Sequence, residues 1–160
     1  MGSFKTSLGA IVRPLGHPTE LVKAKPAEVQ PIGSLVVFDP AGPYYKLAPT
    51  GASGRRFGVV ALANNSAKFD GKREIVTGHG TEVRVNVKSA GVIVPGAEVI
   101  YSASVAGSVD TIGATAEGSF KVVGRYLFRA DEFWKDGINN TFTNAALNDT
   151  ITIQLYGEAR

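Results

Sequence analysis

Few side chains in this 160-residue chain have both the type and the spacing that catalysis or metal binding requires. The two histidines, His17 and His79, lie far apart, and neither has the spacing of a two-histidine metal site. We expect His79, which stands between two glycines, to be an ordinary loop histidine. The chain contains no cysteine, which excludes disulfides, thiolate zinc sites and cysteine nucleophiles. The Gly-x-Ser-x-Gly motif of many serine hydrolases is also missing.

Carboxylates offer the remaining route to chemistry, and they are densest at Asp131, Glu132 and Asp136. Such oxygens suit a calcium ion, but a solvated loop face is the simpler interpretation. A glycosidase would need two carboxylates across a cleft, and nothing in the sequence selects a pair. We therefore predict that the protein is not an enzyme, with no catalytic residues, no cofactor and no metal site.

From residue 31 onward the chain has the pattern of short β-strands separated by turns. The clearest example is the stretch in which Val83, Val85 and Val87 alternate with polar residues. A period of two is typical of a half-buried strand. Turn residues recur at about the ten-residue spacing of all-β proteins, and helical periodicity is nearly absent. This pattern predicts an all-β fold, a small β-barrel or sandwich.

Two stretches of the chain resemble each other, which predicts a fold built from two weakly similar β-units. In both, a turn glycine opens an apolar strand, a phenylalanine follows 24 residues after the glycine, and an alternating strand comes later. The matching features are residues 31–38 and 94–101 with Gly33 and Gly96, then Phe57 and Phe120, then residues 81–87 and 150–156.

Residues 1–30 differ from the rest, with Pro14, Pro18 and Pro26 among several basic and apolar side chains. Proline removes a backbone donor, so this segment is a poor candidate for a central strand or a long helix. We predict an extended N-terminal arm that lies along its own barrel or along a neighbouring subunit; a loosely ordered terminus is the alternative. The sequence thus divides into an arm, residues 1–30, and a β-barrel domain, residues 31–160.

Charge and hydropathy argue against nucleic acid and membrane as direct partners. The 17 basic and 14 acidic residues leave a net charge of +3, and the basic pairs Arg55-Arg56 and Lys72-Arg73 occur in turn-like settings. A nucleic-acid-binding protein concentrates its basic residues in a stripe. No apolar run approaches the ~20 residues that cross a bilayer, and no signal-peptide pattern is present. We expect a soluble protein.

The order of the β-motifs resembles that of bacteriophage capsid decoration, or head cement, proteins. That order is a Gly-polar-Leu-Val strand with a nearby Asp, a Gly-Val-Ala strand, a Pro-Gly turn leading to a Val-x-Tyr strand, a Val-Gly strand and a final alternating strand. These motifs occupy residues 33–36 with Asp39, 58–61, 95–101, 121–124 and 149–155. The chain departs from the family in having Ser34 and Ala97 after the turn glycines, and in an insertion at residues 129–147.

This resemblance implies a β-barrel protein, commonly a homotrimer, that is made in the host cytoplasm and binds the outside of an icosahedral shell after the shell expands. Its partner would be the major capsid protein, and its function would be to stabilise the virion by bridging capsid subunits. The alternatives are another virion module, such as a tail or fibre component, and a carbohydrate-binding domain.

Aromatic side chains contribute most to interfaces, so we expect them to carry the contact. Phe133 and Trp134 lie in a polar loop and would anchor a neighbour or, alternatively, plug one end of the barrel. Tyr44 and Tyr45 are adjacent on a strand, so at least one should be exposed. With three residues of the arm, the full set of interface candidates is Phe4, Leu8, Arg13, Tyr44, Tyr45, Phe133 and Trp134.

Overall fold

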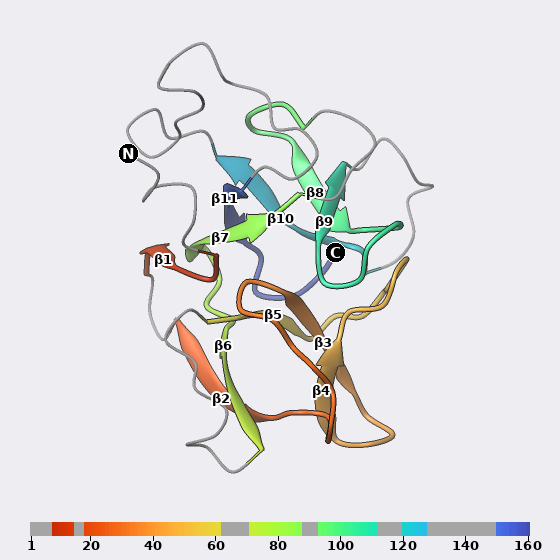
Figure 1. Ribbon diagram of the computed structural model, residues 1–160. Coiled ribbons are helices and arrows are strands. Elements are labelled where there is room, and N and C mark those ends of the chain that lie inside the picture. The colour runs from red at the N-terminus through yellow and green to blue at the C-terminus, as the bar shows by residue number, and fades with distance from the viewer. Residues whose placement is uncertain (1–7, 15–17, 62–70, 88–92, 112–119, 128–149) are drawn as a thin grey trace.

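The described part of the chain consists of β-strands and their connections, which confirms the predicted all-β class (Figure 1). The computed structural model describes residues 8–14, 18–61, 71–87, 93–111, 120–127 and 150–160. The first sheet contains β2 (Thr19–Lys23), β3 (Leu35–Asp39), β4 (Tyr44–Leu47), β5 (Phe57–Val60) and β6 (Lys72–Val76). The second contains β1 (Ile11–Arg13), β7 (Glu82–Asn86), β8 (Glu98–Tyr101), β9 (Val109–Thr111), β10 (Val122–Leu127) and β11 (Thr150–Leu155).

The two sheets have the same internal connectivity, so the fold contains one unit twice. The first sheet has the order β2-β6-β5-β3-β4, and the second has β7-β11-β10-β8-β9 with β1 added beside β7. If the five strands of each unit are numbered along the chain, their order across the sheet is one, five, four, two, three in both units. The first unit, β2–β6, forms the lower half of Figure 1, and the second, β7–β11, forms the upper half.

Equivalent hydrogen bonds support the duplication residue by residue. The turn glycines Gly33 and Gly96 stand 63 positions apart and have φ angles of 84° and 85°. Gly33 N–H donates to the carbonyl of Val60 at 2.8 Å, and Gly96 N–H donates to that of Tyr126 at 2.8 Å. Glycine is needed at both turns because this left-handed backbone conformation disfavours a β-carbon. The same turn therefore leads into β3 and into β8.

Each sheet also curls in the same way. A single parallel bridge joins Ala24, just after β2, to Tyr45 on β4, and another joins Val87, just after β7, to Val109 on β9. Ala24 and Val87 are again 63 residues apart. Within the described residues of each unit, a single β-bridge joins the first strand to the third strand across the open side of the curl. The molecule is thus a sandwich of two curled sheets, and neither sheet is a continuously hydrogen-bonded barrel.

The predicted repeat was wrong in two places. Residues 81–87 and 150–156, which contain β7 and β11, are not equivalent. These two strands pair with each other within the second unit; the counterpart of β7 in the first unit is β2, and the counterpart of β11 is β6. Alternation marks every half-buried strand, so it does not identify a counterpart. The match of Phe57 with Phe120 is also out of register. Phe57 lies opposite Val37, and the equivalent residue of the second unit is Val122, which lies opposite Ile100. At the next paired position, Gly58 and Gly124 lie opposite Val36 and Val99.

The segment predicted to be an extended arm contributes one edge strand to each sheet. β1 pairs with β7, and β2 pairs with β6 over five residues, so β2 is the first strand of the first unit. Pro14 and Pro18 lie outside both strands, and an edge position is where nearby proline is best tolerated. Residues 1–7 and 15–17 fall outside the described residues.

The larger hydrophobic core lies between the sheets, and a smaller one lies inside the curl of the first sheet. Along β3, Leu35 and Val37 belong to the larger core, whereas Val36 and Phe38 contact the smaller one. Both faces of β3 are therefore buried, which explains its unbroken apolar run. Burial of an aliphatic side chain of this size contributes about 1.5–3 kcal/mol to the free energy of folding, so β3 contributes strongly to the stability of the fold.

Candidate functional site

The two equivalent turns before β3 and β8 present apolar side chains to solvent. Pro31 and Ile32 are exposed in the first unit, and Val94 and Pro95 are exposed in the second. The turns close with related hydrogen bonds, from Ser34 N–H to the carbonyl of Pro31 (3.0 Å) and from Ala97 N–H to that of Val94 (3.1 Å). We call residues 31–34 and 94–97 the paired turns.

Exposed apolar side chains are common when they occur singly, so exposure alone does not identify a site. The paired turns differ because the same pair of positions is exposed and apolar in both units. Ile32 is 37% exposed and Val94 is 51% exposed, and Val29, just before the first turn, is 77% exposed. Two units that share one core thus present the same kind of apolar contact twice. The sequence indicates both turns through their Pro and Gly residues but does not indicate their exposure.

The structure separates the two tyrosines that were predicted as interface residues. Tyr44 is half-buried, whereas Tyr45 is 5% exposed and lies in the smaller core. The ring of Tyr45 packs against that of Phe38, with centroids 5.5 Å apart. Neither tyrosine is fully exposed, so the expectation that at least one would be exposed is wrong, and Tyr45 as an interface candidate needs correction. Its ring lies inside its own sheet because the curl of that sheet covers it.

The other interface candidates are described in part. Leu8 is half-buried and packs on the first of the paired turns, since a β-carbon at Gly33 would lie 2.7 Å from Leu8 Cβ. The backbone of Arg13 ends β1, and its side chain lies outside the described residues. Phe4, Phe133, Trp134 and the insertion at 129–147 also lie outside them.

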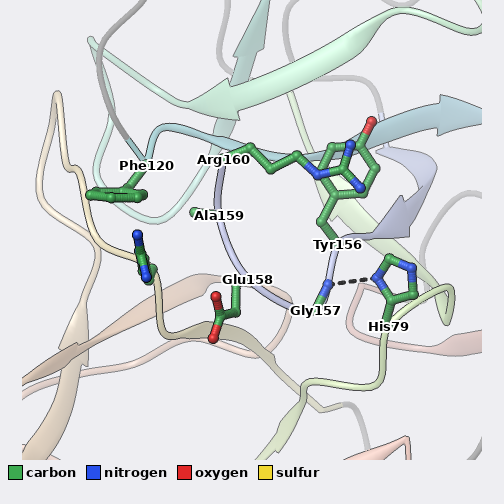
Figure 2. A pocket seen from close by; sticks show the side chains of 8 residues that line it. His79, Phe120, Tyr156, Gly157, Glu158, Ala159 and Arg160 are labelled. Atoms are coloured by element: carbon green, nitrogen blue, oxygen red, sulfur yellow. Dashed lines mark hydrogen bonds between the residues drawn. The ribbon is translucent and has the colours of Figure 1, made fainter.

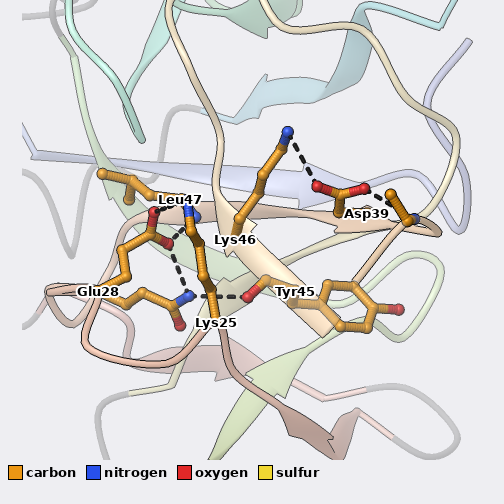
Figure 3. A network of polar contacts seen from close by, with 8 residues as sticks. Lys25, Glu28, Asp39, Tyr45, Lys46 and Leu47 are labelled. Carbon is orange, nitrogen blue, oxygen red and sulfur yellow. Dashed lines mark hydrogen bonds and ion pairs between the residues drawn. The ribbon is translucent and has the colours of Figure 1, made fainter. Parts of the chain in front are cut away.

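A polar network fastens the segment before β3 onto β4 (Figure 3). The carboxylate of Glu28 accepts hydrogen bonds from the backbone N–H of Leu47 and from Gln30 Nε2, which also donates to the carbonyl of Tyr45 at 3.0 Å. Lys25 completes the group at 4.0 Å from Glu28. Because these side chains satisfy backbone groups, the network has a structural role.

A second polar pair flanks the same strand. The carboxylate of Asp39 accepts a hydrogen bond from Ala41 N–H at 3.0 Å and lies 3.4 Å from Lys46 Nζ. The pKa of Asp39 is lowered mainly by the hydrogen bond from Ala41, with a smaller contribution from Lys46. This carboxylate stabilises the turn between β3 and β4 in its charged form.

A polar pocket of about 530 Å³, open to solvent, lies beside the segment that follows β11 (Figure 2). Two arginine–aromatic pairs contribute to it. The guanidinium of Arg55 lies 4.3 Å from the ring centroid of Phe120, and that of Arg160 lies 4.0 Å from the ring centroid of Tyr156. Phe120 has a φ of 62°, which is unusual for a residue with a bulky side chain.

The opposite side of the pocket is formed by His79, whose Nδ1 accepts a hydrogen bond from Gly157 N–H at 2.8 Å (Figure 2). In the neutral imidazole, this bond places the proton on Nε2, which is then a donor. Tyr156 OH donates to a carboxylate oxygen of Glu98 at 2.6 Å. Burial raises the pKa of Tyr156, and the bond to Glu98 raises it further. The phenol is therefore neutral and oriented.

The pocket can bind and orient a ligand through fixed donors. The sequence predicts His79 and Arg55 as ordinary loop residues, and the structure brings them together with residues from the end of the chain. No local pattern would have identified this group, because its members come from separate loops. Within the described residues, no cluster of three or more His, Cys, Asp or Glu side chains could hold a metal ion.

No protein-family model matches the chain, and no curated protein matches it at a significant level. None of the described segments is a helix long and apolar enough to cross a membrane.

Proposed function

We propose that the protein is a structural bacteriophage protein that binds the outside of an expanded capsid and bridges its subunits. The supporting observation is the duplication: two units that share one core present the same apolar turn twice, at 31–34 and at 94–97. A bridge between capsid subunits needs two attachment points whose separation does not change. The shared core between the two sheets supplies that rigidity, since it contains buried side chains from both units.

The energetics of such attachment favour repeated weak contacts. Specific protein interfaces bury more than roughly 1,000 Å², which two small turns do not reach alone. A homotrimer would present the paired turns of three chains, six turns in all. Linked contacts of this kind bind far more tightly than separate ones. Closed symmetry also gives each subunit the same environment and leaves no free interface to extend into fibres. We therefore propose a homotrimer that docks on the major capsid protein.

The test uses expanded capsids of the phage that carries the gene, mixed with the full chain and sedimented. We expect wild-type protein to bind with saturable stoichiometry. Ile32→Lys and Val94→Lys should each weaken binding by tenfold or more, because each places a charge at an apolar contact. Val105→Lys is the matched control, because Val105 is 42% exposed but lies in the β8–β9 connection, outside the paired turns.

Light scattering of the protein variants without capsids tests the oligomer. We expect a particle with three times the 16.8 kDa mass of one chain. A monomer that does not sediment with expanded capsids would rule out the proposal. Equal loss of binding in all three lysine variants would show that the paired turns are not the contact.

A further inference from the structure

We propose that the pocket beside the segment after β11 is a binding site for an oxyanion, a carboxylate or a phosphate group, and that Arg55 is a principal ligand. This inference is independent of the proposed function. It rests on the charge of the pocket, on the orientation of its donors and on the conformation of Phe120.

Among the side chains that line the pocket, two arginines stand against one glutamate. Arg55 and Arg160 contribute two guanidinium groups, and His79 adds a donor at Nε2. Glu158 is the one acidic side chain among the lining residues, and it is exposed. Its carboxylate points away from Arg160 in Figure 2. Ion pairs between described residues form elsewhere, at Lys25–Glu28 and Lys46–Asp39, so no described carboxylate pairs with either arginine.

The donors are held in place before any ligand arrives. Each guanidinium stacks on an aromatic ring, at 4.3 Å for Arg55 on Phe120 and 4.0 Å for Arg160 on Tyr156. A guanidinium that lies over a ring can bind a carboxylate or phosphate through the N–H groups that the ring does not cover. Ligand binding then loses less side-chain freedom than it would with unsupported arginines.

The backbone conformation of Phe120 points to the same site. Its φ of 62° lies in the left-handed region, and the chain keeps it there through a bond from Gly54 N–H to the Phe120 carbonyl at 2.9 Å. Strained residues that the surrounding structure holds in place are concentrated at binding sites. Here the strain orients the ring on which Arg55 stacks.

The position of the pocket in the fold is also that of a binding site. Arg55 belongs to the connection between β4 and β5 of the first unit, and Phe120 lies two residues before β10 of the second. His79 lies in the link between the units, between β6 and β7. Pockets occur preferentially where two structural units meet, and a volume of about 530 Å³ is within the usual range for small ligands.

The experiment is a calorimetric titration of the full chain with citrate and with inorganic phosphate at constant ionic strength. We expect saturable binding of at least one probe. Arg55→Gln should weaken it by tenfold or more, whereas Arg56→Gln should leave it unchanged. Arg56 is a matched control because it too stacks on an aromatic ring, 4.3 Å from Phe38, but it does not line the pocket. Glu158→Gln should strengthen binding about two- to fivefold by removing a like charge.

The outcomes separate the possible ligands and the possible errors. Binding of citrate alone would identify a carboxylate ligand, binding of phosphate alone a phosphate ligand, and binding of both a general oxyanion site. Failure of both probes to bind at 10 mM would overturn the proposal, as would equal weakening in Arg55→Gln and Arg56→Gln. If Arg55→Gln does not fold, NMR of the wild-type chain decides. The amide signal of Gly157, which is bonded to His79, should then shift with ligand concentration, and no shift would overturn the proposal.

Discussion

At the scale of single residues, polar side chains complete the hydrogen bonding of backbone groups that lie outside the strand ladders. Glu28 accepts from the N–H of Leu47, Tyr101 donates to the carbonyl of Gly54, and His79 accepts from the backbone after β11. Each of these bonds joins segments that are distant in sequence. These side chains therefore stabilise loop positions, including the loops that form the pocket.

Tyr101→Phe tests one such bond. The Tyr101 hydroxyl donates to Gly54 at 2.9 Å, and its loss should lower the free energy of unfolding by about 1 kcal/mol at pH 7. Burial raises the pKa of Tyr101 above its ordinary value of 10.0. The stabilisation from the neutral phenol is thus complete below pH 10 and is lost at higher pH, where the unfolded chain ionises first. Urea unfolding at pH 7 and pH 11 measures both effects.

In the Tyr101→Phe variant, the loss of stability between pH 7 and pH 11 should be smaller than in wild type. Tyr44→Phe is the control, because Tyr44 is half-buried and should change the free energy of unfolding little at pH 7. Identical pH dependence in wild type and Tyr101→Phe would contradict the assignment.

At the scale of elements, each unit has a glycine at the same place in its fourth strand. Gly58 on β5 and Gly124 on β10 lie opposite the equivalent residues Val36 and Val99. A β-carbon at Gly124 would lie 2.5 Å from the carbonyl oxygen of Gln154, in the neighbouring strand. The lack of a side chain at this point lets β10 and β11 approach each other closely.

Gly124→Ala should therefore destabilise the protein by about 1–3 kcal/mol, because the obstructing atom is backbone and cannot rotate away. Gly58→Ala should cost less, since its closest contact, at 2.7 Å, is the flexible end of Ile75. Gly54→Ala is the control: its nearest neighbour is a side-chain atom of Val37 at 4.0 Å. Urea unfolding of the three variants checks this order, and a Gly124→Ala variant as stable as Gly54→Ala would contradict it.

At the scale of the whole molecule, the two units share one core and should unfold together. The larger core combines Leu35 and Val59 of the first unit with Val85 and Ile153 of the second. In each sheet, the apolar face that contributes to this core is buried by the other sheet and would be exposed to water without it. The strand order thus shows two units, whereas the free energy of unfolding depends on both units packed together.

Ile153→Ala tests this cooperativity. The substitution creates a cavity in the second unit and should lower the free energy of unfolding by about 2–5 kcal/mol. NMR signals of both units should disappear at the same urea concentration, because a single transition links them. Val105→Ala, at an exposed loop position, should leave the midpoint nearly unchanged. Loss of second-unit signals while those of Val59 and Val76 persist would show that the units unfold separately.

Much of the fold could be predicted from local patterns in the sequence. The valines at alternate positions indicated β7, and the turns that contain proline and Gly33 or Gly96 marked the starts of β3 and β8. The duplication was also predictable, because the turn glycines recur with similar strands after them. These features depend on the conformational preferences of a few neighbouring residues, which the sequence states directly.

Tertiary structure alone decided which strands pair and which side chains meet. Alternation does not distinguish β6 from β7 as the counterpart of β11. The curl that buries Tyr45 and the pocket that joins Arg55, His79 and Arg160 depend on contacts between segments far apart in the chain. Such contacts depend on how well the two sheets pack together. The conformational preferences of neighbouring residues, which the sequence reveals, do not determine that packing.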